Sequence, residues 1–453
     1  MLLNLTVENW KSFRNPVSFS MIKTRERQHN ERIPRLDNYD AGVLPVAAVY
    51  GGNASGKTNL FSALDFMKDF VSRQRAPEER TGVTPFLLSD ETRVGLTKFT
   101  ARILTSDDVV YELSFSLDEK HVDEEELIRV DGKHERVLYQ RKAGKKGIPL
   151  DDSLGLEKPR LKVIFQGTQD NQLFITNSIF QKCEAFRKVY EWFDGILVPI
   201  TPTTPYGVPR EYLTDPKIAE MLRLLDTGII DLGSDKVDLD ENATTRLKKT
   251  LQKKLEDSES VPLSRGPSDP LLVAFASRMK DGEVSLEELI AHHRKIGSDA
   301  PVDFHMSQES DGTRRLIDLL PAFLDVSSPD SRGVYVVDEL DRSLHTLLTR
   351  SLLEHYLDCC SATSRAQFIF TTHDALLMDQ RLLRRDEIWV TERKSDGSSG
   401  LFSFSDYKDA RKDKDIRKSY LQGRLGGVPR IFLDDMLGCP SLGKTGEAKN
   451  EAE

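Results

Sequence analysis

Eight consecutive residues have the pattern of a phosphate-binding loop. Residues 51–58 read GGNASGKT, which matches G-x-x-x-x-G-K-[ST]. In such a loop the glycines let the backbone wrap a phosphate, while successive N–H groups and the following helix N-terminus supply positive potential. The lysine reaches the β- and γ-phosphates, and the threonine hydroxyl binds Mg²⁺. The residues expected to contact a nucleoside triphosphate are Gly51, Gly52, Asn53, Ala54, Ser55, Gly56, Lys57 and Thr58.

A pair of acids follows an apolar run later in the chain. Residues 334–337 read VYVV and lead directly into Asp338 and Glu339. Ligands of open α/β sheets bind at the carboxyl ends of the strands, which is where this pair would lie. We expect Asp338 to hold Mg²⁺ through its water shell and Glu339 to act as general base toward the attacking water. The alternative is an acidic strand end that only caps the next helix.

Two further sites could contact phosphate. His373 lies at the end of the predicted strand in residues 366–374 and could hydrogen-bond the γ-phosphate or the attacking water; otherwise it is an ordinary strand-end histidine. Ser310, Asp311 and Gly312 precede a helical pattern, and small hydroxyl residues around a glycine at a helix N-terminus favour anions. This second anion site makes sense if it serves the nucleotide of another copy. The alternative is a plain N-cap formed by Ser310 or Asp311.

The elements around these residues predict an α/β fold. An apolar strand at 43–50 enters the loop, and helical spacing follows at 59–74. After residue 305 a helix, a strand, a helix and a strand alternate, at 314–326, 333–340, 349–360 and 366–374. Strands that alternate with helices indicate a parallel sheet.

In the middle of the chain the apolar residues follow other spacings. Short strand-like runs at 96–142 predict an antiparallel β lobe. Helical patterns at 217–230, 244–257 and 285–296 predict a helical insertion. The predicted parts are the first half of the nucleotide-binding domain (1–95), the β lobe (96–184), the helical insertion (185–304), the second half of the domain (305–435) and a disordered tail (436–453).

Composition excludes several classes of protein. The net charge of the 453 residues is -9, so the whole surface is not a basic nucleic-acid surface. No apolar run approaches the ~18–20 residues of a membrane span, and the start lacks the pattern of a signal peptide. We expect a soluble, cytoplasmic protein without a membrane partner. Its four cysteines have no CxxC spacing, which favours reduced, packed thiols.

Taken together, the motifs resemble the heads of ABC-type ATPases, the group of the SMC and RecF proteins. Within that group, six segments resemble the stand-alone AAA15 (OLD-like) ATPases of bacterial anti-phage systems such as PARIS, Septu and abortive infection L. The segments are ENWKSF, GGNASGKTNL, ESDGTRRL, DELDRSLH, FTTHD and YLQGRLGGVP. The resemblance covers about residues 1–75 and 305–430.

This resemblance implies roles for the residues and a P-loop fold of the ABC head type. ATP with Mg²⁺ would bind between two copies, each contributing its Walker A loop to one site and its signature motif to the other. Ser310 and Gly312 match the signature, Asp341 the D-loop and His373 the switch histidine. The signature SDGTR lacks the usual glycine pair, which puts its contact with the partner's γ-phosphate in doubt. Gln166 and Gln169 are near candidates for a Q-loop glutamine.

The function expected from the resemblance is an ATP-driven switch with slow hydrolysis. The chain has 80 residues after His373, without the clustered acids of a Toprim nuclease, so we expect it to control a separate effector of Toprim or HNH type. The sequence leaves two alternatives undecided: whether the trigger is derived from the phage, and whether the oligomer is larger than a dimer. The first alternative is a RecF-like or SMC-like repair ATPase that binds DNA through the basic runs 246–254 and 410–418. The second is a scaffold that does not hydrolyse ATP.

Overall fold

The computed structural model describes residues 1–202, 213, 215–236, 260–264, 273–278, 284–298, 300–406, 416–423 and 427. The predicted helix at 244–257, the predicted tail at 436–453 and Cys439 lie outside these residues. In the part of the chain that is described, no helix has both the length and the apolar character needed to cross a bilayer.

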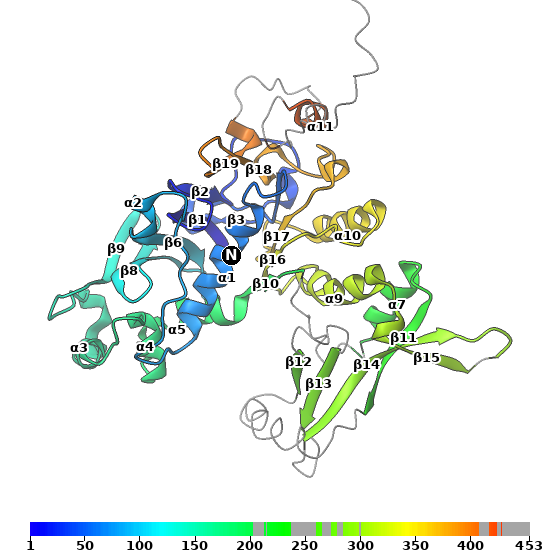
Figure 1. The fold of residues 1–453 in the computed structure, drawn as a ribbon, viewed down its shortest axis with the longest axis horizontal. Helices are drawn as coiled ribbons and strands as arrows, with labels where there is room; N and C mark the ends of the chain where they lie inside the picture. Colours follow the sequence, from blue (N-terminus) through cyan, green and yellow to red (C-terminus); the bar gives the residue numbers. More distant parts are fainter. Residues whose placement is uncertain are drawn as a thin grey trace, which may run out of the picture.

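A mostly parallel sheet lies at the centre of the fold (Figure 1). Its strand order is β10-β16-β17-β5-β18-β19; β19 runs antiparallel to β18, and the other neighbours are parallel. Parallel neighbours end at the same edge, so the segments that follow β5, β16 and β17 emerge together. The strands are β5 (Val46–Gly51), β10 (Leu197–Ile200), β16 (Val334–Val337), β17 (Gln367–Thr371), β18 (Ile388–Arg393) and β19 (Ser399–Ser403).

Both faces of this sheet are covered by apolar side chains. Along β5, Ala47 and Val49 join a core with α1, whereas Ala48 and Tyr50 join a second core with α9 and α10. Alternate side chains of a strand point to opposite faces, which is why a continuous apolar run suits this central strand. The helices on these two faces are α1 (Lys57–Ser72), α9 (Asp311–Val326) and α10 (Thr346–Cys359).

An antiparallel sheet forms the lobe on the α1 side (Figure 1). Its order is β2-β1-β6-β7-β8-β9, so the N-terminal strands belong to the same sheet as the strands predicted at 96–142. The α/β fold with a β lobe is therefore confirmed. The strands of this sheet are β1 (Leu2–Glu8), β2 (Val17–Ser20), β6 (Thr97–Leu104), β7 (Val110–Leu117), β8 (Val122–Asp131) and β9 (His134–Lys142).

Shorter elements complete the described chain. The remaining helices are α2 (Asp90–Arg93), α3 (Lys158–Gln166), α4 (Phe174–Phe180), α5 (Arg187–Glu191), α7 (Pro216–Leu224) and α11 (Ile416–Leu421), with a π-helical turn η5 at Trp192–Ile196. Short 3-10 helices are η1 (Asn30–Arg32), η2 (Asp37–Tyr39), η3 (Asp152–Glu157), η4 (Glu184–Phe186), η6 (Met306–Gln308), η7 (Ala375–Leu377), η8 (Arg385–Glu387) and η9 (Phe404–Asp406). A two-stranded sheet pairs β3 (Arg35–Leu36) with β4 (Ala41–Gly42).

The helical insertion predicted at 185–304 is wrong for most of its described part. Residues 285–296, expected as a helix, lie largely in β14, and the helix predicted at 217–230 ends at Leu224 before β11. β14 pairs with β11 along one edge, and with β13 and β15 along the other. These pairings override a local pattern that suits a helix. The strands are β11 (Ile229–Lys236), β12 (Ser260–Ser264), β13 (Val273–Arg278), β14 (Val284–Arg294) and β15 (Pro301–His305).

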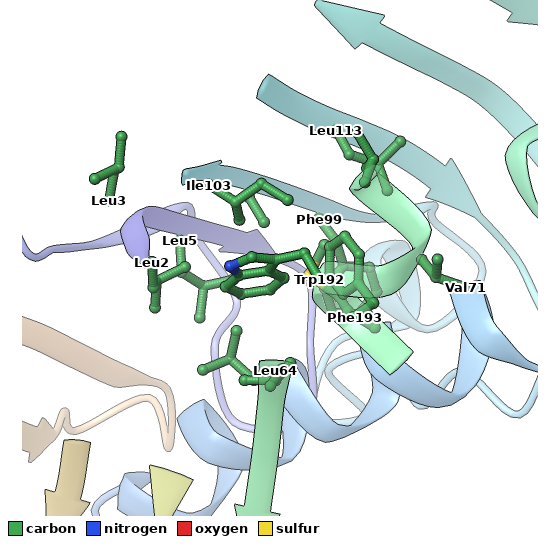
Figure 2. Close-up of a cluster of buried hydrophobic side chains, with 14 of the residues drawn as sticks. Leu2, Leu3, Leu5, Leu64, Val71, Phe99, Ile103, Leu113, Trp192 and Phe193 are labelled. Carbon is green, nitrogen blue, oxygen red and sulfur yellow. The ribbon is translucent and has the colours of Figure 1, made fainter. Parts of the chain in front are cut away.

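Helix α1 links the β lobe to the central sheet. Trp192 and Phe193 are fully buried beside Leu64 of α1, with Leu5 of β1 and Phe99 of β6 in the same cluster (Figure 2). Aromatic side chains of this size contribute much of the apolar area that a core buries. The helix that begins in the phosphate loop is therefore held along its length by the lobe.

We expect Leu64→Ala to lower the free energy of unfolding by about 2–5 kcal/mol, because it leaves a cavity in this cluster. Leu64 is 1% exposed. Leu156→Ala is the control, since Leu156 is 98% exposed and its truncation removes little buried surface. Urea unfolding of both variants measures the difference. Equal stability of the two variants would mean that α1 is not held by this cluster.

Candidate nucleotide-binding site

Lys57 is buried at the end of the phosphate loop, where α1 begins. Its Nζ donates hydrogen bonds to the backbone carbonyls of Gly51 at 2.8 Å and Gly52 at 3.2 Å. The residue is only 6% exposed, and this burial lowers the pKa of its ammonium, while the charges of Asp338 and Glu339 act in the opposite direction. The ammonium therefore lies inside the loop and senses both acids.

The neighbouring strand β18 supports the loop through Thr391. Gly51 has φ +151°, and a Cβ there would lie 2.5 Å from the Ser55 Oγ. That hydroxyl is hydrogen-bonded to the Oγ1 of Thr391 on β18 at 2.6 Å. Only glycine fits where the backbone passes so close to its support. Asn53, Ala54 and Thr58 are exposed, so the Thr58 hydroxyl can face a bound metal ion.

Thr371 joins the two acids at the end of β16. Its hydroxyl donates to the Oδ1 of Asp338 at 2.6 Å and accepts from the backbone N–H of Glu339 at 2.7 Å. The Asp338 carboxylate is therefore oriented by a strand from another part of the sequence. Glu339 has φ +51°, a conformation uncommon outside glycine and enriched at functional sites. Its half-exposed side chain is accessible, whereas Asp338 is buried.

Arg315 reaches the same acids from α9. Its Nη2 donates to the backbone carbonyls of Asp338 at 3.0 Å and Glu339 at 3.2 Å. The residue is 6% exposed, and burial lowers the pKa of its guanidinium. A charged donor to two carbonyls fixes the turn that carries the acids. The helix that follows Ser310 is thereby tied to the Asp338-Glu339 turn.

His373 and Asp341 lie at the same edge of the sheet. The backbone N–H of His373 approaches both carboxylate oxygens of Asp341 at 3.3 Å. Partial burial lowers the pKa of His373, the positive charge of Lys57 lowers it further, and Asp341, Glu339 and Asp338 oppose both effects. Its imidazole is therefore within the electrostatic reach of the phosphate loop and of the acids, and the lowered pKa favours its neutral form.

The segment Ser310-Asp311-Gly312 occupies a different position. Ser310 is the N-cap of α9 and accepts a hydrogen bond from the Thr313 N–H at 3.1 Å, while Asp311 pairs with Arg314. A Cβ on Gly312 would lie 2.7 Å from the carbonyl of Ser343, so this segment packs on the turn after Asp341. Ser310 is exposed. The plain N-cap alternative describes its local geometry, and an anion site for another copy stays a prediction.

Thr371, Arg315 and Thr391 are the site residues that the sequence analysis missed. Thr371 lies two residues before His373, in a segment where the sequence pattern indicated a role only for the histidine. Arg315 lies in the second turn of α9, and the sequence indicated a possible site only at the N-terminus of this helix. Of the Q-loop candidates, Gln166 ends α3, and the carbonyl of Gln169 accepts from Arg141 in the β lobe. These contacts give neither glutamine a part in the site.

The residues brought together can accommodate a magnesium nucleotide. Thr58 offers an exposed hydroxyl and Asp338 an oriented carboxylate, which are oxygen donors of the kind that Mg²⁺ prefers. The ion would neutralise phosphate charge when bound. Glu339 follows Asp338 in the chain with a half-exposed carboxylate, and Lys57 lies within the electrostatic reach of both acids.

We expect Thr371→Val to lower kcat for nucleotide hydrolysis about tenfold, because the Asp338 carboxylate and the Glu339 N–H lose their shared partner. The control is Thr176→Val, which removes a buried hydroxyl that donates to the Val71 carbonyl at 2.8 Å in the lobe. Steady-state kinetics and urea unfolding of both variants separate catalysis from stability. An unchanged kcat in Thr371→Val would refute the role given to this hydroxyl.

Several solved structures are similar to this chain. The SMC head bound to the C-terminal winged-helix domain of ScpA is 14% identical and gives a TM-score of 0.38 over 89% of this chain and 97% of that chain. The SMC head domain from Thermotoga maritima is 15% identical, with a TM-score of 0.32 over 89% and 98%. The recombination mediator RecF with ATP is 13% identical, with a TM-score of 0.36 over 89% and 99%. Values this low do not assign a function.

Comparison with curated protein sequences gives no match. The family described as "AAA domain, putative AbiEii toxin, Type IV TA system" matches residues 46–379. This range begins with β5 and includes the phosphate loop, the segment around Ser310, the Asp338-Glu339 pair and His373. It covers more than half of the chain and contains each of these segments. The chain therefore belongs to this family of AAA-domain ATPases.

Proposed function

We propose that this chain is an ATP-hydrolysing switch of the ABC type. The observation that carries the proposal is the meeting of Lys57, Asp338, Glu339 and His373 at one edge of the central sheet. Lys57 and the loop amides bind the phosphates, and Thr58 with Asp338 holds Mg²⁺. Glu339 takes the proton of the attacking water, and neutral His373 hydrogen-bonds that water or the γ-phosphate.

We also propose that two copies bind ATP between them. Ser310 caps a 16-residue helix, α9, whose N-terminus carries positive potential, and the side chain is exposed. The Ser310 hydroxyl accepts a hydrogen bond from the Thr313 N–H and is also hydrogen-bonded to the Thr313 hydroxyl. A second copy that offers its own phosphate loop to this end would complete both sites, and hydrolysis would separate the copies.

The biological output proposed is control of a separate toxic effector in bacterial anti-phage defence. The family description, which names AbiEii and a type IV toxin–antitoxin system, supports a role of this kind. The effector would be a nuclease of Toprim or HNH type, restrained in the cytoplasm until infection is sensed. Copurification of the chain with the products of its neighbouring genes tests this step, and a chain recovered alone would argue against it.

Glu339→Gln should lower ATP turnover about 100-fold or more, because an amide cannot take the water's proton. It should also trap an ATP-bound dimer, visible by light scattering as a doubled mass that requires ATP. Lys57→Ala should abolish ATP binding and remain monomeric. Glu354→Gln, on α10 and paired with Arg350, is the control for loss of a carboxylate.

Hydrolysis by Glu339→Gln at the parent rate would refute the assignment of the base. A monomer in every nucleotide state would refute the ATP-dependent dimer. Turnover that rises with duplex DNA, and falls again with salt, would instead favour the DNA-repair alternative.

A further inference from the structure

His293 of β14 is hydrogen-bonded to the residue that precedes the N-cap of α9. Its Nε2 lies 2.5 Å from the Oε1 of Glu309, whose side chain is only 6% exposed. His293 lies on the same face of β14 as Leu289 and Ala291, which belong to the core that also contains α9. A carboxylate removed from water is costly unless a donor of this kind pairs with it. The contact therefore fastens the five-stranded sheet to the start of α9, beside which the sheet lies in Figure 1.

The segment that begins with Glu309 makes two further contacts, at intervals of three residues. Gly312 packs so closely on the turn after the acids that a Cβ there would lie 2.7 Å from the Ser343 carbonyl. Arg315 donates to both carbonyls of the Asp338-Glu339 pair. Residues three apart in a helix are neighbours on its surface, so Gly312 and Arg315 contact the same turn. The start of α9 thus contacts the five-stranded sheet through its first residue and the turn of the acids through the others.

We propose that His293 is a positioning residue for hydrolysis, which links the sheet of β11 to β15 to the turn that carries the acids. The inference rests on the nucleotide site proposed above. A shift of Glu309 moves the start of α9, and with it the guanidinium of Arg315 relative to the two carbonyls that it binds. Glu339 is then presented to the attacking water in a different geometry, and small errors in such geometry are costly to the rate. These contacts do not involve the phosphate loop, so they affect hydrolysis more than ATP binding.

The test compares two adjacent histidines of β14 in the full chain. His293→Ala removes the contact with Glu309, whereas His292→Ala removes a contact at 2.7 Å with Asp303 of β15, within the same sheet. The two histidine side chains are 20% and 25% exposed, so their removal is well matched. His293→Ala should lower kcat for ATP hydrolysis about 5- to 10-fold. It should leave Kd for ATP within about twofold of the parent. His292→Ala should leave both at the parent values.

A double-mutant cycle shows whether His293 acts through Glu309. Glu309→Ala removes the same contact without altering the sheet and should lower kcat as much as His293→Ala does. The double variant should lose no more than either single variant, because both substitutions remove one interaction. His293→Gln keeps a group that can donate to the carboxylate, so it should retain at least about half of the parental kcat. Urea unfolding of each variant separates these losses from a loss of stability.

The inference is overturned if His293→Ala or Glu309→Ala hydrolyses ATP as the parent does, or if His292→Ala loses as much. Losses that multiply in the double variant would also overturn it, as would His293→Gln as impaired as His293→Ala. Turnover that survives Lys57→Ala would instead overturn the proposed nucleotide site, and this inference with it.

Discussion

The parallel pairing of β16, β17 and β5 is the constraint on which the candidate site depends. It brings the segment after β5 (Val46–Gly51) together with the ends of β16 (Val334–Val337) and β17 (Gln367–Thr371), hundreds of residues later in the chain, because the carboxyl ends of parallel neighbours share one edge. The loop after β5 supplies Lys57, the turn after β16 supplies the acids, and the end of β17 supplies Thr371 and His373. The Thr371 hydroxyl then joins two of these strands at the acids themselves.

A buried ammonium at this edge restricts what can surround it. Removing Lys57 from water is unfavourable unless carbonyls and opposite charges replace the water. The carbonyls of Gly51 and Gly52 and the nearby acids supply that replacement. Holding the carbonyls requires a rigid loop, and the loop is supported by Thr391 of β18 and by the packing of α1 against the β lobe. Parts of the fold that are far apart in sequence thus stabilise the buried ammonium of Lys57.

Local patterns were sufficient to predict the loop, the acids and the elements that carry them. The apolar runs before residue 51 and before Asp338 indicate buried strands within a few residues, and the structure has β5 and β16 there. The fold of 284–294 could not be read in this way, because its strand conformation comes from pairing with β11, β13 and β15. Arg315 and Thr371 were missed for a related reason: their partners are backbone and side-chain atoms of other elements. Such contacts have no signature in neighbouring residues.

The central claim is that each nucleotide site is completed by a second copy, and mixing two inactive variants tests it most directly. Lys57→Ala lacks a working phosphate loop but keeps Ser310, whereas Ser310→Arg blocks that helix end but keeps Lys57. In a mixed dimer one site would contain both intact parts, so an equimolar mixture should recover roughly a quarter of the parental ATPase activity, although each variant alone is inactive. If the mixture stays as inactive as its components, or if Ser310→Arg alone hydrolyses ATP at the parental rate, the shared site is contradicted.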